Sequence, residues 1–461
     1  MKKYNIAYLL GLCLVSAMGG LLFGYDWVVI GGAKPFYELY FGISTSPALQ
    51  GWAMSSALIG CIFGALIAGG TADKYGRKKL LLLAAALFII SAFGTGASES
   101  FNFFIIYRLI GGAGIGIAST MSPMYIAEIT PKEIRGLFVS INQLTIVLGI
   151  LAAQITNMLI AQPMPETAII DGITMSWNVQ TGWRWMFWAE LVPAGMFFLL
   201  MLTVPESPRF LAKVNKYDQV SRILSRIGGS EYVRSALPQI KNSLIDTSPG
   251  ITLKPLFNKR IGPILLMGII LAAFQQWCGI NVIFNYAEEV FRSAGYSIDE
   301  MFINIVITGS VNLVFTIIAM GTVDRLGRRK LMLFGSSGLA LSYFILGFFY
   351  FMEITGWPML LLIITAIGIY AMSLAPITWV VLSEIFPNRI RGVAMSIATL
   401  SLWIASSLLV LTFPFLNLFF KTSGTFWVYC VICVAGFIYI KRNLPETKGK
   451  SLEEIENELT K

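Results

Sequence analysis

The sequence predicts an all-α membrane protein of twelve transmembrane helices, arranged as two six-helix halves that are related by duplication. Composition is the first reason, because the chain is 56% hydrophobic and only 13% charged, whereas soluble domains carry about 25% charged residues. Internal repetition is the second reason, because three charged or polar motifs recur in the same order in both parts of the chain. Parallel repeats of this kind are typical of secondary transporters.

The repeated motifs mark corresponding ends of apolar segments. The motif pairs are DKYGRKKL (73–80) with DRLGRRKL (324–331), EITPKEIRG (128–136) with EIFPNRIRG (384–392), and the weaker PES (205–207) with PET (445–447). Two homologous halves are the simplest explanation of these pairs.

The predicted helices follow from long apolar segments, since about 20 mostly apolar residues are needed to cross a bilayer. Nine segments carry no charge: 39–72, 80–98, 136–165, 261–287, 301–323, 331–352, 354–383, 392–420 and 422–440. Three more contain a charged residue, namely 6–32 around Asp26, 102–127 around Arg108, and 185–204 around Glu190. Six segments therefore precede and six follow a polar central stretch.

The predicted domains are an N-terminal half (1–204), a cytoplasmic helical linker (205–260), a C-terminal half (261–442) and a cytoplasmic tail (443–461). Most of the 34 Lys and Arg fall on the side that holds the linker and both termini, whereas Lys34 falls in an expected outer loop. The positive-inside rule then places both termini in the cytoplasm of a multi-pass cell-membrane protein, in bacteria the inner membrane. This topology explains the net charge of +9 without a nucleic-acid partner.

Several kinds of chemistry are excluded. The chain has no histidine, so serine–histidine triads and histidine metal sites cannot form. Cys430 and Cys433 have metal-site spacing but lie in an uncharged span without a second ligand pair. Glycines 112, 114 and 116 resemble part of a dinucleotide fingerprint, but with Gly60 and Gly64 they are better explained as small residues at helix contacts. We expect no metal, no cofactor and no enzymatic activity.

Asp26 and Arg108 are the two charges expected deep in the bilayer, where such groups are costly unless paired or hydrated. Both fall in the first half, so they are expected to face each other across its interior. One interpretation is a static ion pair that fixes helix register. The other is a proton carrier, because a change in the separation of Asp26 and Arg108 would change the proton affinity of Asp26. Glu190 is interpreted as an interfacial or structural charge.

A set of amide and tryptophan side chains suits an uncharged polyol. Amides donate and accept hydrogen bonds as hydroxyl groups do, and a tryptophan ring offers a flat apolar face. The candidate binding residues are Gln143, Gln275, Gln276, Asn281, Asn312, Trp379 and Trp403. Each amide alone could instead join helices, but a span interrupted at Pro376 favours a binding site near the bilayer midplane.

The chain resembles the sugar porter family of the major facilitator superfamily, and within it the bacterial D-xylose–proton symporters. The residues that carry the resemblance are both DxxGR turns, Tyr107-Arg108, Pro205 to Arg209, Gln275-Gln276, Gly279 to Asn281, Trp379, Ser383 to Pro387 and Pro445 to Gly449. The resemblance implies that the amides and tryptophans line a sugar site and that Asp26 with Arg108 couples it to protons. It also implies a gate at Asn285, Tyr286 and Pro376. Asn285, Ala375 and Leu402 depart from the usual family residues, so gate motion and sugar identity stay open.

The repeated charged motifs predict a cytoplasmic latch of inter-helix ion pairs that forms in the outward-facing state. Its expected members are Asp73, Arg77, Glu128, Arg135, Glu206, Asp324, Arg328, Glu384 and Arg391. Alternatively, these charges only set the topology.

The sequence therefore predicts proton-coupled symport of a monosaccharide, D-xylose or a related pentose or hexose, by alternating access of the two halves. The expected partners are the sugar, the proton and the lipid bilayer, with the monomer as the functional unit. The alternatives are a facilitative sugar uniporter, in which Asp26 is only structural, and a non-transporting sugar sensor. The short stretch after Lys441 disfavours the sensor.

Overall fold

The computed structural model describes residues 4–163, 174–245, 261–387, 391–448, 450 and 452–459, and within these ranges it contains helices and no strand. The N-terminal half contains α1 (Ile6–Tyr40), α2 (Pro47–Tyr75), α3 (Arg77–Ala97), α4 (Phe101–Ile129), α5 (Arg135–Ile160), the π-helix η1 (Asn178–Gly182), α7 (Trp183–Trp188) and α8 (Leu191–Thr203). Then follow α9 (Pro208–Lys213) and α10 (Tyr217–Ile245). The C-terminal half contains α11 (Gly262–Trp277), α12 (Ile280–Asn285), α13 (Ala287–Ser293), α14 (Ile298–Leu326), α15 (Arg328–Phe351), α16 (Trp357–Met372), α17 (Leu374–Ile385) and α18 (Arg391–Asn443), and α19 (Leu452–Leu459) follows.

Twelve membrane spans are present in the described residues. Eleven helical stretches are long and apolar enough to cross a bilayer, and one of them, Gly392–Asn443, has 52 residues. The backbone of Lys421 is not helical (φ 56°, ψ 176°), so α18 bends there and supplies two spans. The predicted number of spans is therefore confirmed.

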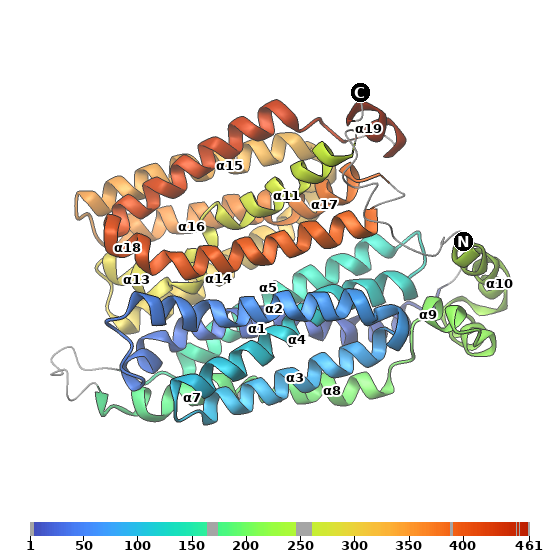
Figure 1. Ribbon diagram of the computed structural model, residues 1–461, viewed down its shortest axis with the longest axis horizontal. Coiled ribbons are helices and arrows are strands. Elements are labelled where there is room, and N and C mark those ends of the chain that lie inside the picture. Colours follow the sequence, from blue (N-terminus) through green and yellow to red (C-terminus); the bar gives the residue numbers. More distant parts are fainter. Residues whose placement is uncertain are drawn as a thin grey trace.

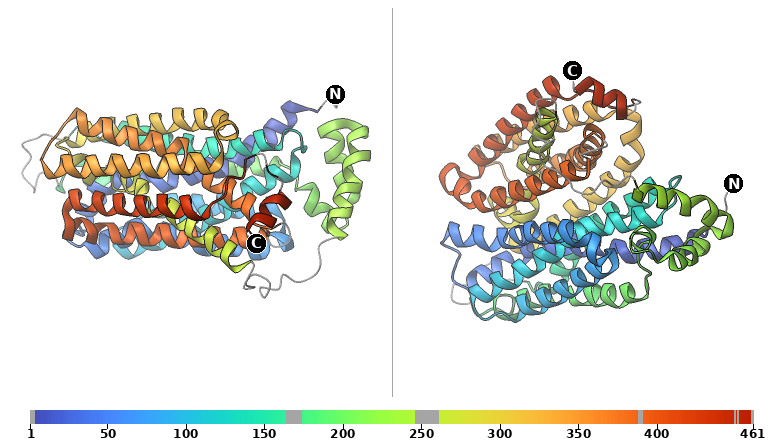
Figure 2. Two further views of the ribbon diagram at one scale, coloured as in Figure 1. Left: turned by 90° about the horizontal axis from the view of Figure 1, so that it is seen from above. Right: turned by 45° about the vertical axis from the view of Figure 1, so that its right-hand side comes forward.

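The two halves form two bundles that lie side by side (Figures 1 and 2). The N-terminal bundle is blue to green and the C-terminal bundle is yellow to red. They meet where α1 contacts α12 and α13, α5 contacts α14, and α2 contacts α18. Helices α9, α10 and α19 lie at the same end of the molecule, and α10 contacts α1. A hydrogen bond of 2.8 Å from the Asn5 amide to the Ile227 carbonyl joins α1 to α10.

Glycines set the close contact between α2 and α4. A Cβ atom at Gly112 would lie 1.9 Å from the carbonyl oxygen of Ala57, and one at Gly60 would lie 2.2 Å from that of Leu109. Any larger residue would force the helices apart, as expected for small residues at membrane helix contacts. The interpretation of this glycine run as a packing feature is confirmed.

The first helix is longer than the sequence predicted. Helix α1 continues past residue 32 to Tyr40, through Lys34 and Pro35. Lys34 is therefore not in an outer loop; its side chain is only 2% exposed. A hydropathy pattern cannot place a charged residue whose partners are distant in sequence, and Lys34 pairs with Glu288, 254 residues away.

Two spans of the C-terminal half are broken near their middle. Helix α11 ends at Trp277, and Gly279, with φ of +90°, starts the short helix α12. Helices α16 and α17 meet at Ser373, whose φ and ψ are −124° and −88°. Pro376 follows three residues later and has no N–H to continue the helix across this break. The expected interruption near Pro376 is confirmed, and next to it the carbonyl of Ala375 accepts a hydrogen bond from Gln275 of α11.

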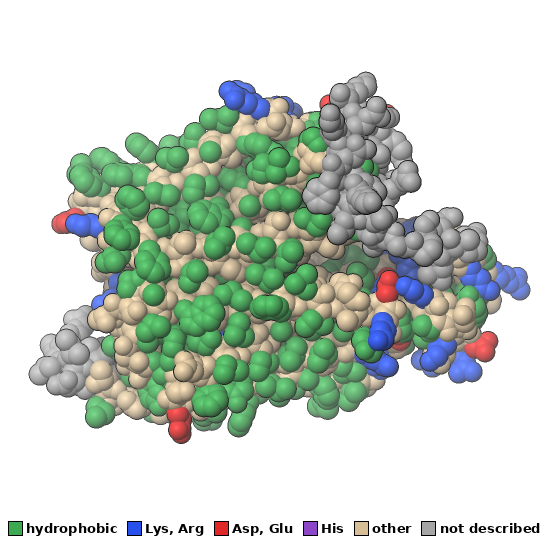
Figure 3. All heavy atoms as spheres, viewed as in Figure 1, with side chains coloured by type: hydrophobic (Ala, Val, Ile, Leu, Met, Phe, Trp, Pro, Cys, Tyr) green, Lys and Arg blue, Asp and Glu red, His purple; other side chains and the backbone are tan. Residues whose placement is uncertain are grey.

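The surface agrees with a multi-pass membrane protein. In the view of Figure 3, apolar side chains cover the length of the helices, while Lys and Arg gather at the end that holds α9 and α10. Large apolar side chains that are exposed in the structure include Phe93, Leu159, Leu199 and Phe419. Such a surface is stable only against lipid.

Candidate functional site

Asp26 on α1 and Arg108 on α4 form a buried ion pair inside the N-terminal half. Each side chain is 1% exposed, and Arg108 Nη1 donates to Asp26 Oδ1. Arg108 Nη2 also donates to the backbone carbonyl of Asp26 at 3.1 Å. The other carboxylate oxygen, Oδ2, accepts no hydrogen bond from the described residues. The pair thus joins α1 to α4 and leaves one carboxylate oxygen without a hydrogen-bond donor among the described residues.

Glu190, at the start of α8, is the third ionisable group of this centre. It is 1% exposed and interacts electrostatically with both Asp26 and Arg108. The interfacial part of its interpretation is therefore wrong, while the structural part stays a prediction. The signal was present in the sequence, since a glutamate in a span of 20 mostly apolar residues is costly unless it has a function or a partner. The ring of Phe187 covers the Arg108 guanidinium at 5.5 Å and helps to exclude water.

Gln275, Gln276 and Asn281 come together at the break between α11 and α12. Gln276 Nε2 donates to Gln275 Oε1 at 3.3 Å, and Asn281 Nδ2 donates to Gln276 Oε1. Gln275 Nε2 donates to the carbonyl of Ala375 at 3.2 Å, which ties the cluster to α17. All three side chains are buried. The broken helix therefore concentrates three amides at one place inside the C-terminal half, next to α17.

The other predicted binding residues lie on α5, α14, α17 and α18. Trp403 on α18 contacts Phe23 of the N-terminal half, with ring centroids 5.6 Å apart, and its indole N–H has no partner among the described residues. Gln143 on α5 and Asn312 on α14 belong to two helices that pack against each other across the interface. Trp379 is half-buried on α17. Phe23, which sequence reasoning missed, offers a second aromatic face beside Trp403.

Two of the predicted gate residues, Asn285 and Tyr286, lie at the end of α12, whereas Pro376 lies near the start of α17. Asn285 Nδ2 donates to the carbonyl of Asn281 at 2.9 Å. The Tyr286 hydroxyl donates to the carbonyl of Val410 at 2.6 Å, and its ring lies 4.3 Å from that of Phe413 on α18. These contacts hold α12 and α13 against α18 within the C-terminal half.

The charged motif of the N-terminal half forms a network at the end near α9. Arg77 Nη2 lies 2.9 Å from Glu128 Oε1, and Arg77 Nη1 lies 3.4 Å from Asp73 Oδ1. Glu206 accepts from the backbone N–H of Arg77 at 3.0 Å and thereby caps α3. Arg135 donates to the carbonyl of Thr130 at 3.4 Å, and no ion pair between Arg135 and Glu128 is present among the described contacts.

The C-terminal half repeats this network. Arg328 Nη2 lies 3.1 Å from Glu384 Oε1, and Glu446 accepts from the backbone N–H of Arg328 at 2.8 Å, as Glu206 does for Arg77. Thr447 donates to Glu384 at 2.6 Å, as Ser207 donates to Glu128. The side chains of Asp324 and Arg391 lie outside the described part of the structure. The described ion pairs of both networks join helices of the same half.

Glu446 shows why the third repeated motif matters. Its partial burial raises the pKa of the carboxyl group, but backbone N–H donors from Lys448 and Arg328 outweigh this effect and hold the pKa below its ordinary value. Glu446 therefore stays charged and caps α15.

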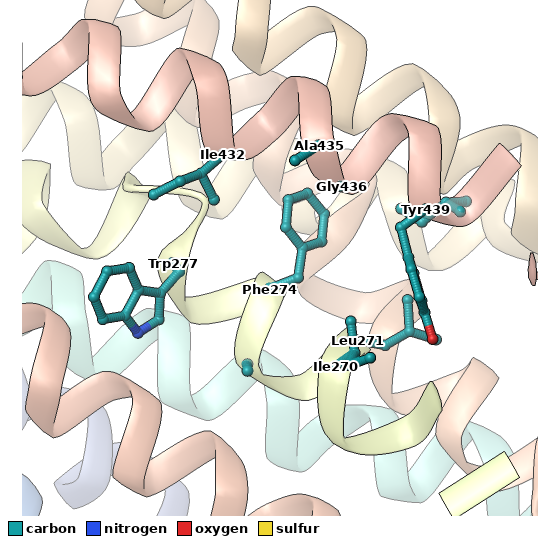
Figure 4. A pocket seen from close by; sticks show the side chains of 10 residues that line it. Ile270, Leu271, Phe274, Trp277, Ile432, Ala435, Gly436 and Tyr439 are labelled. Atoms are coloured by element: carbon teal, nitrogen blue, oxygen red, sulfur yellow. The ribbon is translucent and has the colours of Figure 1, made fainter. Parts of the chain in front are cut away.

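An apolar pocket lies between α11 and the last part of α18 (Figure 4). Its lining includes Phe274, Trp277, Ile432, Gly436 and Tyr439. The amides Gln275 and Gln276 do not line it, so it lacks the hydrogen-bonding groups that a polyol requires. This pocket is therefore distinct from the amide cluster.

Comparison with known proteins identifies the family. The family model described as "Sugar (and other) transporter" matches residues 12–459. The chain belongs to this family. The arabinose-proton symporter of Bacillus subtilis (strain 168) is 39% identical over 99% of this chain and 96% of its own length. The D-xylose-proton symporter of Escherichia coli (strain K12) is 39% identical over 98% of this chain and 96% of its own length.

The same family supplies the structural match. The inward open conformation of the xylose transporter XylE from E. coli superposes with a TM-score of 0.85, at 36% identity, over 98% of this chain and 99% of that chain. The predicted fold, two six-helix halves of the major facilitator superfamily, is therefore confirmed, and the protein is a transporter and not an enzyme.

Proposed function

We propose that this member of the sugar transporter family carries a monosaccharide into the cell together with a proton, by alternating access of its two halves. The observation that carries the proposal is the buried Asp26–Arg108 pair, in which one carboxylate oxygen accepts no hydrogen bond from the described residues. A uniporter has no need of such a costly group. The two symporters named above, for arabinose and for D-xylose, are proton-coupled by name.

Asp26 is the group proposed to bind and release the proton. Arg108 pairs with its carboxylate inside the bundle, and Glu190 is the third buried ionisable group of this centre. A movement of α1 relative to α4 would change how closely Arg108 approaches Asp26. We propose that this movement accompanies the change between outward-facing and inward-facing states, and that Glu190 shares the proton with Asp26.

The sugar is proposed to bind at the amide cluster. Gln275, Gln276 and Asn281 would exchange hydrogen bonds with sugar hydroxyls, in place of the two bonds that now join these amides to one another. Trp403 would contribute a ring face and an N–H donor that is not already used by the described residues. Gln143, Asn312 and Trp379 would complete the site from α5, α14 and α17. The substrate class is a pentose or hexose.

Topology and assembly complete the proposal. Both termini and the α9–α10 linker are assigned to the cytoplasm of a bacterial cell, because the basic residues gather at that end. The functional unit is proposed to be the monomer, because the proton and sugar sites both lie within one chain.

Uptake into proteoliposomes tests the function. Purified protein is reconstituted and offered a panel of labelled pentoses and hexoses, with and without an imposed inward proton gradient. Accumulation of one sugar above its external concentration, only when the gradient is present, supports symport. Equilibration without accumulation would instead identify a uniporter, and binding without uptake would identify a sensor.

A further inference from the structure

Lys34 lies at the centre of a buried cluster of charges that the proposed proton and sugar sites do not use. Its ammonium group lies 2.9 Å from Glu38 Oε1, 2.5 Å from Glu289 Oε1 and 3.5 Å from Glu288 Oε2. Arg292, whose side chain is 61% exposed, pairs with Glu288 at 3.0 Å at the rim of the cluster. One buried cation thus forms ion pairs with three carboxylates.

The cluster joins the two halves of the protein. Lys34 and Glu38 belong to α1 of the N-terminal half, whereas Glu288 and Glu289 belong to α13 of the C-terminal half. Helix α13 lies at the end of the molecule opposite α10 (Figure 1), so the cluster is at the outer end if α10 is cytoplasmic. The ion pairs therefore close the interface between the halves on the outer side.

The cluster is also attached to the predicted gate. The Lys34 ammonium lies 5.8 Å from the centroid of the Tyr286 ring. Gln50 of α2 donates to Glu38 at 2.9 Å and keeps that carboxylate in place. Below the cluster the two backbones are in close contact, since a Cβ atom at Gly31 would lie 2.9 Å from the carbonyl oxygen of Phe284. Opening of the outer side must separate Lys34 from Glu288 and Glu289.

Separation of Lys34 from Glu288 and Glu289 is expected to be an all-or-none change between a closed and an open cluster. A buried charge without its partner is strongly unfavourable, so the cluster is stable either closed and dry or open and hydrated. If Lys34 were removed, the three carboxylates would repel one another and favour the open arrangement. If the exposed Arg292 were removed, little would change, because exposed ion pairs contribute little.

We propose that Lys34 is the centre of an inter-half charge lock, formed with Glu38, Glu288 and Glu289, that holds the outer side closed and must break each time the site opens outward. The proposal rests on the alternating-access function proposed above, but its residues are separate from the proton and sugar sites. It gives the transporter an energetic barrier to opening outward.

Thiol labelling from the outside tests the lock. Ser55 is buried on α2, one turn after Gly51, where a Cβ atom would lie 2.6 Å from the carbonyl oxygen of Leu411 on α18. Ser55→Cys therefore reports the opening of the outer interface. A membrane-impermeant thiol reagent is added to right-side-out vesicles, and labelling of the parent chain without Ser55→Cys is subtracted. Lys34→Met is expected to raise the labelling rate of this cysteine at least tenfold, whereas Lys34→Arg keeps it near the parent value. Lys421→Met, at an exposed outer lysine, is the matched control and is expected to cause no change.

An exchange of charges between two positions distinguishes loss of the charge lock from a general loss of structure. Lys34→Glu combined with Glu289→Lys restores one cation among three carboxylates and is expected to return labelling toward the parent rate. Unchanged labelling in Lys34→Met would overturn the proposal, and so would rapid labelling in both the single and the exchanged variants. No sugar or proton gradient is used, so the labelling result stands apart from the outcome of the uptake assay.

Discussion

Arg108 binds Asp26 twice, once through the side-chain carboxylate and once through the backbone carbonyl oxygen. The second contact matters because it fixes the guanidinium against α1 even when the carboxylate changes its charge. A proton that binds Asp26 therefore weakens one contact and leaves the other. This arrangement allows the carboxylate to be neutralised without a complete separation of α1 and α4.

Asp26→Asn should abolish proton-driven accumulation while sugar binding and exchange remain. The amide has nearly the same shape as the carboxylate but cannot carry the proton. Uptake against a sugar gradient, with and without an imposed pH gradient, measures the effect. Glu99→Gln, at an exposed carboxylate between α3 and α4, serves as control. An Asp26→Asn variant that still concentrates sugar would exclude Asp26 as the coupling group.

Arg108→Gln should also uncouple transport, for the opposite reason. Without the guanidinium, burial keeps Asp26 protonated through the cycle. Arg108→Lys should retain part of the coupling, because a lysine is charged but cannot form the same two-nitrogen contact. The ratio of internal to external sugar concentration should therefore be highest in the parent, lower in Arg108→Lys and lowest in Arg108→Gln. Equal accumulation in all three would show that the charge of Arg108 is not needed.

The sequence predicted the spans and the repeat well because both depend on local features. Apolar length alone identifies a membrane helix, and the capping roles of Glu206 and Glu446 follow from a motif that is present twice. Lys34 and Glu190 were misplaced because their burial depends on partners elsewhere in the chain. The contacts of Gln276 with Asn281 could be expected from spacing across Gly279, but the contact of Trp403 with Phe23 joins segments from different halves. Such contacts require the arrangement of the halves, which no local pattern contains.

Arg77→Ala should lower thermal stability and shift the population toward the inward-facing state. Arg77 and Glu128 are both largely buried, with side chains 9% and 6% exposed, and breaking a buried pair costs about 3–5 kcal/mol. Lys213→Ala is the matched control, since Lys213 pairs with Asp73 on the exposed side of the same network and exposed pairs contribute about 0–1 kcal/mol. Thermal unfolding in detergent and cytoplasmic-side thiol labelling measure the two effects. If Arg77→Ala behaves like Lys213→Ala in both, the network only sets topology.

Gln276→Ala and Asn281→Ala should each weaken sugar binding by about tenfold or more. Each substitution removes the hydrogen bond from Asn281 Nδ2 to Gln276 Oε1. An unsatisfied buried polar group costs about 1–3 kcal/mol, and roughly 1.4 kcal/mol changes the dissociation constant tenfold. Because the two amides form one unit, the double variant should lose less than the sum of the two single losses. Gln239→Ala, at an exposed glutamine of α10, controls for the loss of an amide elsewhere.

Trp403→Ala should weaken the binding of different sugars more evenly than the amide substitutions do. Its ring contributes apolar contact area, which depends little on hydroxyl orientation, whereas each amide distinguishes one hydroxyl arrangement from another. Trp403→Phe should recover part of the affinity, because it restores a ring face without the indole N–H. Titration calorimetry with sugars that differ at single hydroxyl positions measures both trends. If Trp403→Ala and the two amide variants all bind every sugar with the affinity of the parent, the sugar site lies elsewhere. None of the contacts proposed here would then contribute to binding.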